Sequence, residues 1–150
     1  MKIFIASDHA GFNLKEVLVK YLEKLDYEVI DKGPEVLDLN DDYPDFISLV
    51  AKEVSNNPKV KGIVIGGSGQ GEAMVANRFP GVRASVYYGG AIGMIRTTRE
   101  HNDSNILSLG ARFLIDEDAK EAVKLWLDTP FGSDERHISR IRKIESYPLK

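Results

Sequence analysis

Short apolar segments alternate with amphipathic helical segments along this chain, and this alternation restricts the possible folds more than any other feature. Five segments are predicted to be strands: 1–6, 27–31, 61–65, 82–87 and 105–109. Apolar residues at helical spacing follow them and predict helices near 14–25, 45–55, 74–78, 91–100 and 119–127. The strands are too apolar to face water on one side, which is typical of a parallel sheet with helices on both faces. We therefore predict an α/β, three-layer αβα Rossmann-like fold with about five parallel strands, in a single domain over 1–150.

The composition excludes several classes of protein. The net charge is −3 and no aromatic stripe separates the basic residues, so we expect neither nucleic acid nor an anionic membrane as a partner. No run of about 18 apolar residues is present to span a membrane, and the N-terminal apolar run is too short for a signal peptide. The absence of cysteine excludes disulfides, thiolate metal sites and cysteine nucleophiles, and three histidines argue against a histidine-rich metal site. We expect a cytoplasmic protein without a thiolate or histidine-rich metal site.

The last segment, 131–150, differs from the rest of the chain. It is basic, it follows Pro130, and it places Ile138, Ile141 and Ile144 near helical spacing. Because the segment follows a helix breaker and has an apolar edge of its own, we predict a C-terminal helix that packs on a partner subunit.

A glycine-rich loop, GGSGQGE over 66–72, follows the third predicted strand. Ligands of open parallel sheets bind beyond the carboxyl ends of the strands, which is where this loop begins. The loop matches neither of two familiar phosphate-binding motifs. Glu72 stands where a dinucleotide fingerprint needs its third glycine, and Glu72-Ala73 replaces the Lys-Ser/Thr pair of a P-loop. Since a carboxylate there would repel a phosphate, the loop is not predicted to bind nucleotides.

Glu72 has two interpretations at this point. A carboxylate near a helix N-terminus is favoured by about 0.3–1 kcal/mol, and many first-turn acids do nothing more. Alternatively, Glu72 is a general base beside backbone N–H groups that hold a developing oxyanion. That arrangement suits removal of a proton next to a carbonyl group.

Further polar groups gather at the predicted strand ends and in the tail. Arg136 and Arg140 are four residues apart and share one helix face, so they can hold a single anion. Arg112 follows the fifth predicted strand. Taken alone, each arginine can be a solvated surface charge, and a lone histidine is more often structural than catalytic. Two more turns carry titratable groups: Asp8-His9 after the first strand and His101-Asn102 before the fifth.

Five separated segments resemble one known family, in the same order. They are SDHAGFNLK at 7–15, DYPDF at 42–46, GGSGQGEAMVANRFPGVRA at 66–84, REHNDSNILSLGAR at 99–112 and ERHISRIRKIE at 135–145. Over nearly its whole length the chain resembles the ribose-5-phosphate isomerase type B family, which also includes the galactose-6-phosphate isomerase subunits. The resemblance implies conversion of an aldose phosphate to its ketose through a cis-enediolate, without a metal or organic cofactor. It also implies a homodimer, or a dimer of dimers, with active sites shared between subunits.

The resemblance assigns roles position by position. Asp8 and His101 would assist opening of the furanose ring, while Tyr43 and His9 would lie near the sugar. The residues around the enediolate oxygens would be Gly67, Gly69, Gly71, Asn102 and the catalytic Ser68. The phosphate would be bound by Arg112, Arg136 and Arg140, the last two reaching across the dimer.

One departure from the family pattern concerns the base. Many members have a catalytic cysteine directly after the third strand, where this chain has Gly66. Another branch, known from actinobacteria, lacks that cysteine and has a glutamate at the position that matches Glu72. The resemblance therefore implies that Glu72 is the base and moves a proton between C1 and C2.

The leading hypothesis is an isomerase of ribose 5-phosphate and ribulose 5-phosphate in the non-oxidative pentose phosphate pathway. One alternative is the same chemistry on a six-carbon substrate, allose 6-phosphate or galactose 6-phosphate. Because a galactose-type enzyme usually needs two different subunits and this chain carries both the base and the arginine tail, the pentose enzyme is favoured. The second alternative is a non-catalytic phosphosugar-binding module.

Overall fold

The computed structural model describes residues 1–147 and contains one parallel sheet of five strands. The strands lie in the order β2-β1-β3-β5-β4. Their bounds are β1 Lys2–Ser7, β2 Glu28–Asp31, β3 Lys61–Gly66, β4 Ala84–Tyr87 and β5 Ile106–Gly110. All five predicted strands are confirmed, with the ends of each within two residues of the prediction. Since every pairing is parallel, all five carboxyl ends meet at one edge of the sheet.

Residues 1–147 also form six α-helices and one short 3₁₀ helix. They are η1 His9–Gly11, α1 Phe12–Lys24, α2 Tyr43–Asn56, α3 Gln70–Ala76, α4 Gly93–Glu100, α5 Asp116–Asp128 and α6 Glu135–Ser146. A helix is confirmed at the predicted position 74–78, but its predicted start is wrong, because α3 begins inside the glycine-rich loop, and it stops at Ala76. It ends there because the side chain of the next residue, Asn77, exchanges two hydrogen bonds with the backbone of Ala84.

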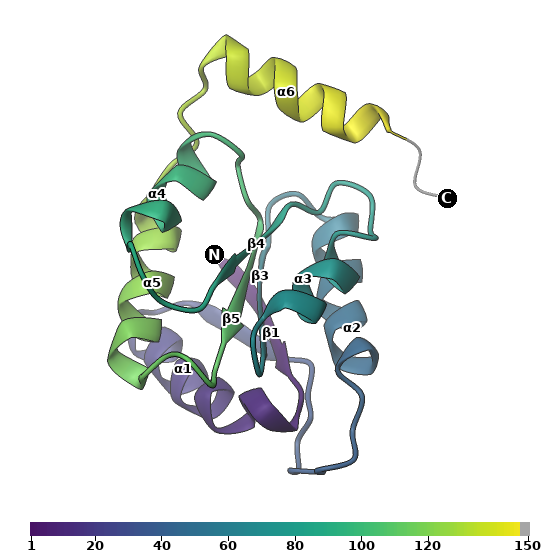
Figure 1. Cartoon of the computed structure of the whole chain (residues 1–150), viewed down its shortest axis with the longest axis vertical. Helices are drawn as coiled ribbons and strands as arrows, with labels where there is room; N and C mark the ends of the chain where they lie inside the picture. Colours follow the sequence, from purple (N-terminus) through teal and green to yellow (C-terminus); the bar gives the residue numbers. More distant parts are fainter. Residues whose placement is uncertain (148–150) are drawn as a thin grey trace.

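Helices cover both faces of the sheet (Figure 1), and each face buries a separate apolar core. Odd-numbered strand residues such as Ile5 and Ile63 face α1, α4 and α5, around the fully buried Trp126. Even-numbered residues such as Phe4 and Val64 face α2 and α3. Burial of each large side chain stabilises the fold by about 1.5–3 kcal/mol. The three-layer prediction is therefore confirmed.

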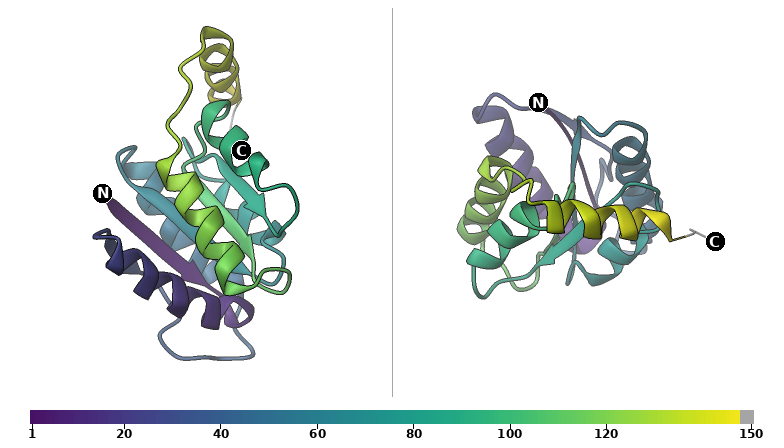
Figure 2. Two further views of the ribbon diagram at one scale, coloured as in Figure 1. Left: turned by 90° about the vertical axis from the view of Figure 1, so that its left-hand side faces the viewer. Right: turned by 90° about the horizontal axis from the view of Figure 1, so that it is seen from above.

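Helix α6 projects from the end of the domain where the strands begin (Figures 1 and 2). Ile144 is half exposed, and the side chain of Arg136 is 65% exposed. The predicted C-terminal helix is confirmed, whereas its packing on a partner stays a prediction. The last three residues of the predicted tail, 148–150, lie outside the described residues. Within residues 1–147 no helix combines the length and the apolar character that crossing a membrane requires.

Candidate active site

A cavity of about 440 Å³ lies at the carboxyl edge of the sheet. Chain segments that leave β1, β3 and β5 form its walls, and α2 contributes a tyrosine. The lining residues are Asp8, Ala10, Tyr43, Gly67, Ser68, Gly71, Glu72, Arg112 and Phe113. The structure therefore brings most of the predicted site residues of the sheet edge into one cavity, as the topology requires.

The glycine-rich loop packs tightly against the segment that follows β5. Backbone N–H groups of Ala111 and Arg112 donate to the carbonyl oxygens of Gly66 and Gly67, at 2.8 and 3.1 Å. Gly69 adopts a φ of +77°, and a Cβ there would lie 3.0 Å from the carbonyl carbon of Leu109. Only glycine meets both conditions without strain. The loop is thus held open to the cavity by its backbone.

Glu72 lies in the first turn of α3 and lines the cavity, although only 4% of the residue is exposed. Its carboxylate occupies the space beside Gly66, where a Cβ would come within 1.9 Å of Oε1. Burial raises the pKa of Glu72, and the nearby Asp8 raises it further, while the backbone N–H groups of Glu72 and Gly69 lower it. A buried carboxylate with a raised pKa beside a cavity has the properties of a general base.

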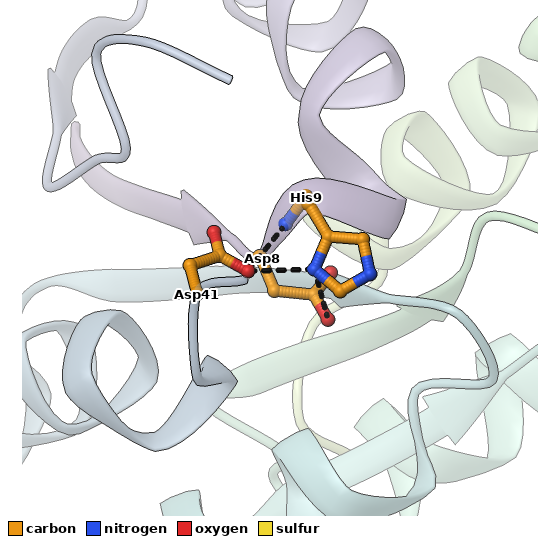
Figure 3. A group of neighbouring side chains, drawn as sticks. All are labelled: Asp8, His9 and Asp41. Carbon is orange, nitrogen blue, oxygen red and sulfur yellow. Dashed lines mark hydrogen bonds and ion pairs between the residues drawn. The ribbon is translucent and has the colours of Figure 1, made fainter. Parts of the chain in front are cut away.

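Asp8 and His9 occupy the turn after β1. The Asp8 carboxylate accepts a hydrogen bond from the backbone of Gly11 at 3.1 Å and so caps η1. The His9 ring contacts the Asp41 carboxylate, with Nδ1 2.6 Å from Oδ1 (Figure 3). Asp41 was not among the site residues predicted from the sequence. That hydrogen bond raises the pKa of His9, against an opposing effect of burial.

Asp8, His9 and Asp41 are also the one group among residues 1–147 whose ligand atoms lie close enough together to hold a metal ion. The 2.6 Å distance between His9 Nδ1 and Asp41 Oδ1 is that of a short hydrogen bond. Because this hydrogen bond accounts for the geometry, we assign no metal to the group, and the metal-free site stays a prediction.

Six predicted site residues do not line this cavity: His9, Gly69, His101, Asn102, Arg136 and Arg140. Of these, His9 directly follows the lining residue Asp8 in the chain, and Gly69 directly follows Ser68. His101 follows α4 and stacks on His137 of α6, with 4.3 Å between the ring centroids and 13° between the ring planes. His101 and Asn102 precede β5, whereas the glycine-rich loop follows β3, so the two groups lie at opposite edges of a parallel sheet. The five residues of β5 separate these edges by roughly 16 Å. One chain therefore holds two groups of predicted site residues that do not meet.

Two arginines that sequence reasoning missed hold the turn of this second group. Arg99 is buried and donates to Asp103 and to the backbone of Ser104, at 2.8 and 2.6 Å. Arg83 donates to the carbonyl oxygen of Asn102 at 3.1 Å and reaches Glu145 of α6 at 2.9 Å. These contacts link the turn to α6, but nothing in the residue pattern distinguishes either arginine from a surface charge.

Comparisons with known proteins show which family the chain resembles. The family model described as Ribose/Galactose Isomerase matches residues 3–144. A probable ribose-5-phosphate isomerase B of Mycoplasma pneumoniae is 39% identical over 97% of this chain and 93% of its own length. Ribose-5-phosphate isomerase B of Mycobacterium tuberculosis is 33% identical over 98% of this chain and 90% of its own length.

Solved structures extend the similarity to the fold. Ribose-5-phosphate isomerase B of Mycoplasma genitalium, solved with bound ribulose-5-phosphate, has a TM-score of 0.93 at 39% identity and covers 97% of this chain and 95% of its own. The Clostridium thermocellum enzyme has a TM-score of 0.91 at 44% identity, with the same coverage of 97% and 95%. The resemblance noted in the sequence is confirmed, and the chain belongs to the Ribose/Galactose Isomerase family.

Proposed function

We propose that this protein is a cytoplasmic aldose–ketose isomerase that interconverts ribose 5-phosphate and ribulose 5-phosphate. The observation that carries the proposal is the buried Glu72 carboxylate, with its raised pKa, at the wall of a cavity formed by the glycine-rich loop. The bound ribulose-5-phosphate in the M. genitalium relative supports the choice of a five-carbon substrate.

In the proposed mechanism Glu72 removes the proton from C2 of the open aldose and returns it to C1, while the hydroxyl proton on O2 passes to O1. The cis-enediolate that forms between these steps carries negative charge on its oxygens. Backbone N–H groups of the glycine-rich loop and the Ser68 hydroxyl stabilise that charge, because they are fixed before the reaction begins. Asp8 lies in the same cavity, where it assists ring opening together with His101.

We further propose that each complete site is formed by two copies of the chain. The cavity group supplies the base, and the group on α4 and α6 supplies His101, Asn102, Arg136 and Arg140 to the cavity of a partner. The separation of the two groups across the sheet and the exposure of Arg136 support this proposal. A symmetric dimer repeats the contact and makes two equal sites.

The test is an assay of the purified protein with ribose 5-phosphate, with Glu72→Gln assayed beside it. We expect ribulose 5-phosphate from the wild type, and a loss of turnover without a loss of binding in the variant. Turnover of allose 6-phosphate or galactose 6-phosphate in its place would contradict the substrate assignment. Binding of ribose 5-phosphate without turnover would indicate a phosphosugar-binding module.

Mixed dimers test the shared site. Glu72→Gln and Arg136→Ala each damage one group, so a mixed dimer contains one site with both changes and one intact site. At ribose 5-phosphate concentrations well below the wild-type KM, where Arg136→Ala is nearly inactive, unfolding and refolding the two variants together should recover about a quarter of wild-type activity, since half of the dimers are mixed. No recovery would mean that each chain uses its own arginine.

A further inference from the structure

The contact between His9 and Asp41 joins two distant parts of the chain at the edge of the cavity. His9 directly follows a lining residue, Asp8, and Asp41 lies 32 residues further along. One oxygen of Asp41 accepts two hydrogen bonds from His9, from the backbone N–H at 3.1 Å and from ring Nδ1 at 2.6 Å. Two bonds to one residue fix the rotation of the ring as well as its position.

The chemistry of the pair determines where the ring carries its hydrogen. An ionised carboxylate only accepts hydrogen bonds, so Nδ1 of His9 must carry a hydrogen in this contact. The second ring nitrogen, Nε2, points away from Asp41 (Figure 3). The His9 side chain is 29% exposed.

Three charged groups, Asp41, Asp8 and Arg112, affect the protonation of this ring. The Asp41 hydrogen bond has the largest effect and raises the pKa of His9, and the charges of Asp8 and Asp41 raise it further. Burial and the charge of Arg112 lower the pKa. Protonated His9 and Arg112 together present positive charge to an anionic group of the substrate.

The loop that delivers Asp41 is tied down at its first residues. Lys15 of α1 is fully buried, and its ammonium group contacts the Asp31 carboxylate and the carbonyl oxygen of Pro34, the latter at 3.0 Å. The backbone N–H of Gly33 donates to the Asp31 carboxylate at 2.8 Å, and the Gly33 carbonyl oxygen accepts from the backbone N–H of Ser7 of β1 at 3.0 Å. Asp41 is therefore held between an anchored segment and the start of α2, and its approach to His9 is built into the fold.

We propose that Asp41 is a positioning residue, which holds the His9 ring with Nδ1–H bound and Nε2 directed to the substrate. The inference rests on the proposed function in one respect, since it assumes that a sugar phosphate occupies the cavity. It adds a residue outside the segments through which the chain resembles its family. Asp41 acts only through His9 and touches no substrate atom.

The contact is tested by NMR of the histidine ring nitrogens in the full-length protein. The chain has only three histidines, so single His→Gln variants assign every ring signal. We expect the His9 signals to show a hydrogen on Nδ1 and a titration midpoint above that of an ordinary histidine. In Asp41→Asn the midpoint should fall, whereas Asp42→Asn should leave it unchanged. Asp42 is a matched control because its exposed side chain makes no hydrogen bond among residues 1–147.

Kinetics then test whether the contact matters to the substrate. We expect Asp41→Asn to raise KM for ribose 5-phosphate about tenfold at neutral pH with a smaller change in kcat, since a charge-assisted contact weakens. In a His9→Gln background the same change should have no further effect, because Asp41 acts through His9. An additional loss in that background would assign Asp41 a merely structural role and overturn the inference.

The two proposals fail in distinguishable ways. If the wild type neither binds nor converts ribose 5-phosphate, the proposed function is wrong, although the His9 signals still report the contact with Asp41. If the wild type is active but His9 titrates identically in wild type and Asp41→Asn, the role of Asp41 is refuted and the function stands. An altered His9 titration with wild-type KM would also refute it.

Discussion

Replacing Gly66 by alanine should displace the proposed base, Glu72, without removing it. A Cβ at this position would lie 1.9 Å from Oε1, 2.2 Å from Cδ and 2.8 Å from Oε2 of Glu72. Non-bonded atoms do not approach Cβ so closely, so the carboxylate must move by about 1 Å or more. Misplacement of a reacting group by that distance costs about 100-fold in rate. We therefore expect kcat for ribose 5-phosphate to fall about 100-fold in Gly66→Ala, with a smaller change in KM.

Gly62→Ala is the matched control for this experiment. Gly62 lies on the same strand, and a Cβ there would meet Val50 Cγ1 at 2.7 Å and Ile106 Cγ1 at 3.0 Å, both apolar and away from the cavity. Overpacking of this kind destabilises a core by about 1–3 kcal/mol. Both variants should therefore lose stability in chemical unfolding, but only Gly66→Ala should lose kcat. Wild-type kcat in folded Gly66→Ala would refute the placement of the base.

Three other changes have expected outcomes. Burial raises the pKa of Glu72, so the folded protein loses stability as pH rises through that pKa. Glu72→Gln should therefore have a higher melting temperature than the wild type at about pH 8 and the same melting temperature at about pH 4. A lower melting temperature of the variant at both pH values would contradict this. Lys15→Met should lower the free energy of unfolding in urea by about 2–3 kcal/mol, because Asp31 loses its buried partner while its own side chain is one-third exposed. A loss below about 1 kcal/mol would be inconsistent with Lys15 as an anchor of the loop after β2. Arg136→Ala should raise KM at least tenfold with little change in kcat, and an unchanged KM would remove Arg136 from the phosphate site.

The layers and the parallel sheet of this fold follow from local sequence. Strands such as β1 and β3 are apolar on both faces, and that pattern occurs where helices cover both sides of a parallel sheet. The start of α3 could not be predicted, because it lies in the glycine-rich loop. Glycine is a poor helix former and adds no apolar residue to the helical pattern. The position of the cavity could also be predicted, because parallel strands end at the same edge of the sheet and their following turns carry the polar residues.

The separation of the site into two groups was implicit in the sequence. His101 and Asn102 precede a strand while Asp8 and Arg112 follow strands, so a parallel sheet puts them at opposite edges. The partners of long-range contacts could not be predicted in this way. Asp41 reaches His9 across an irregular loop with no periodicity, and the burial of Lys15 depends on where that loop begins. Such contacts depend on the path of a loop, which local spacing does not determine.

The central claim is that Glu72 moves the proton of the reaction. The most direct measurement follows the C2 proton of ribose 5-phosphate by NMR in deuterated water, with wild type and Glu72→Gln at equal concentration. The account predicts that the wild type removes this proton from C2 as ribulose 5-phosphate forms, with a hydrogen or a solvent deuterium arriving at C1, and that the variant binds the sugar but leaves the proton in place. Loss of the C2 proton at the wild-type rate in Glu72→Gln would contradict the account, because another group would then be the base.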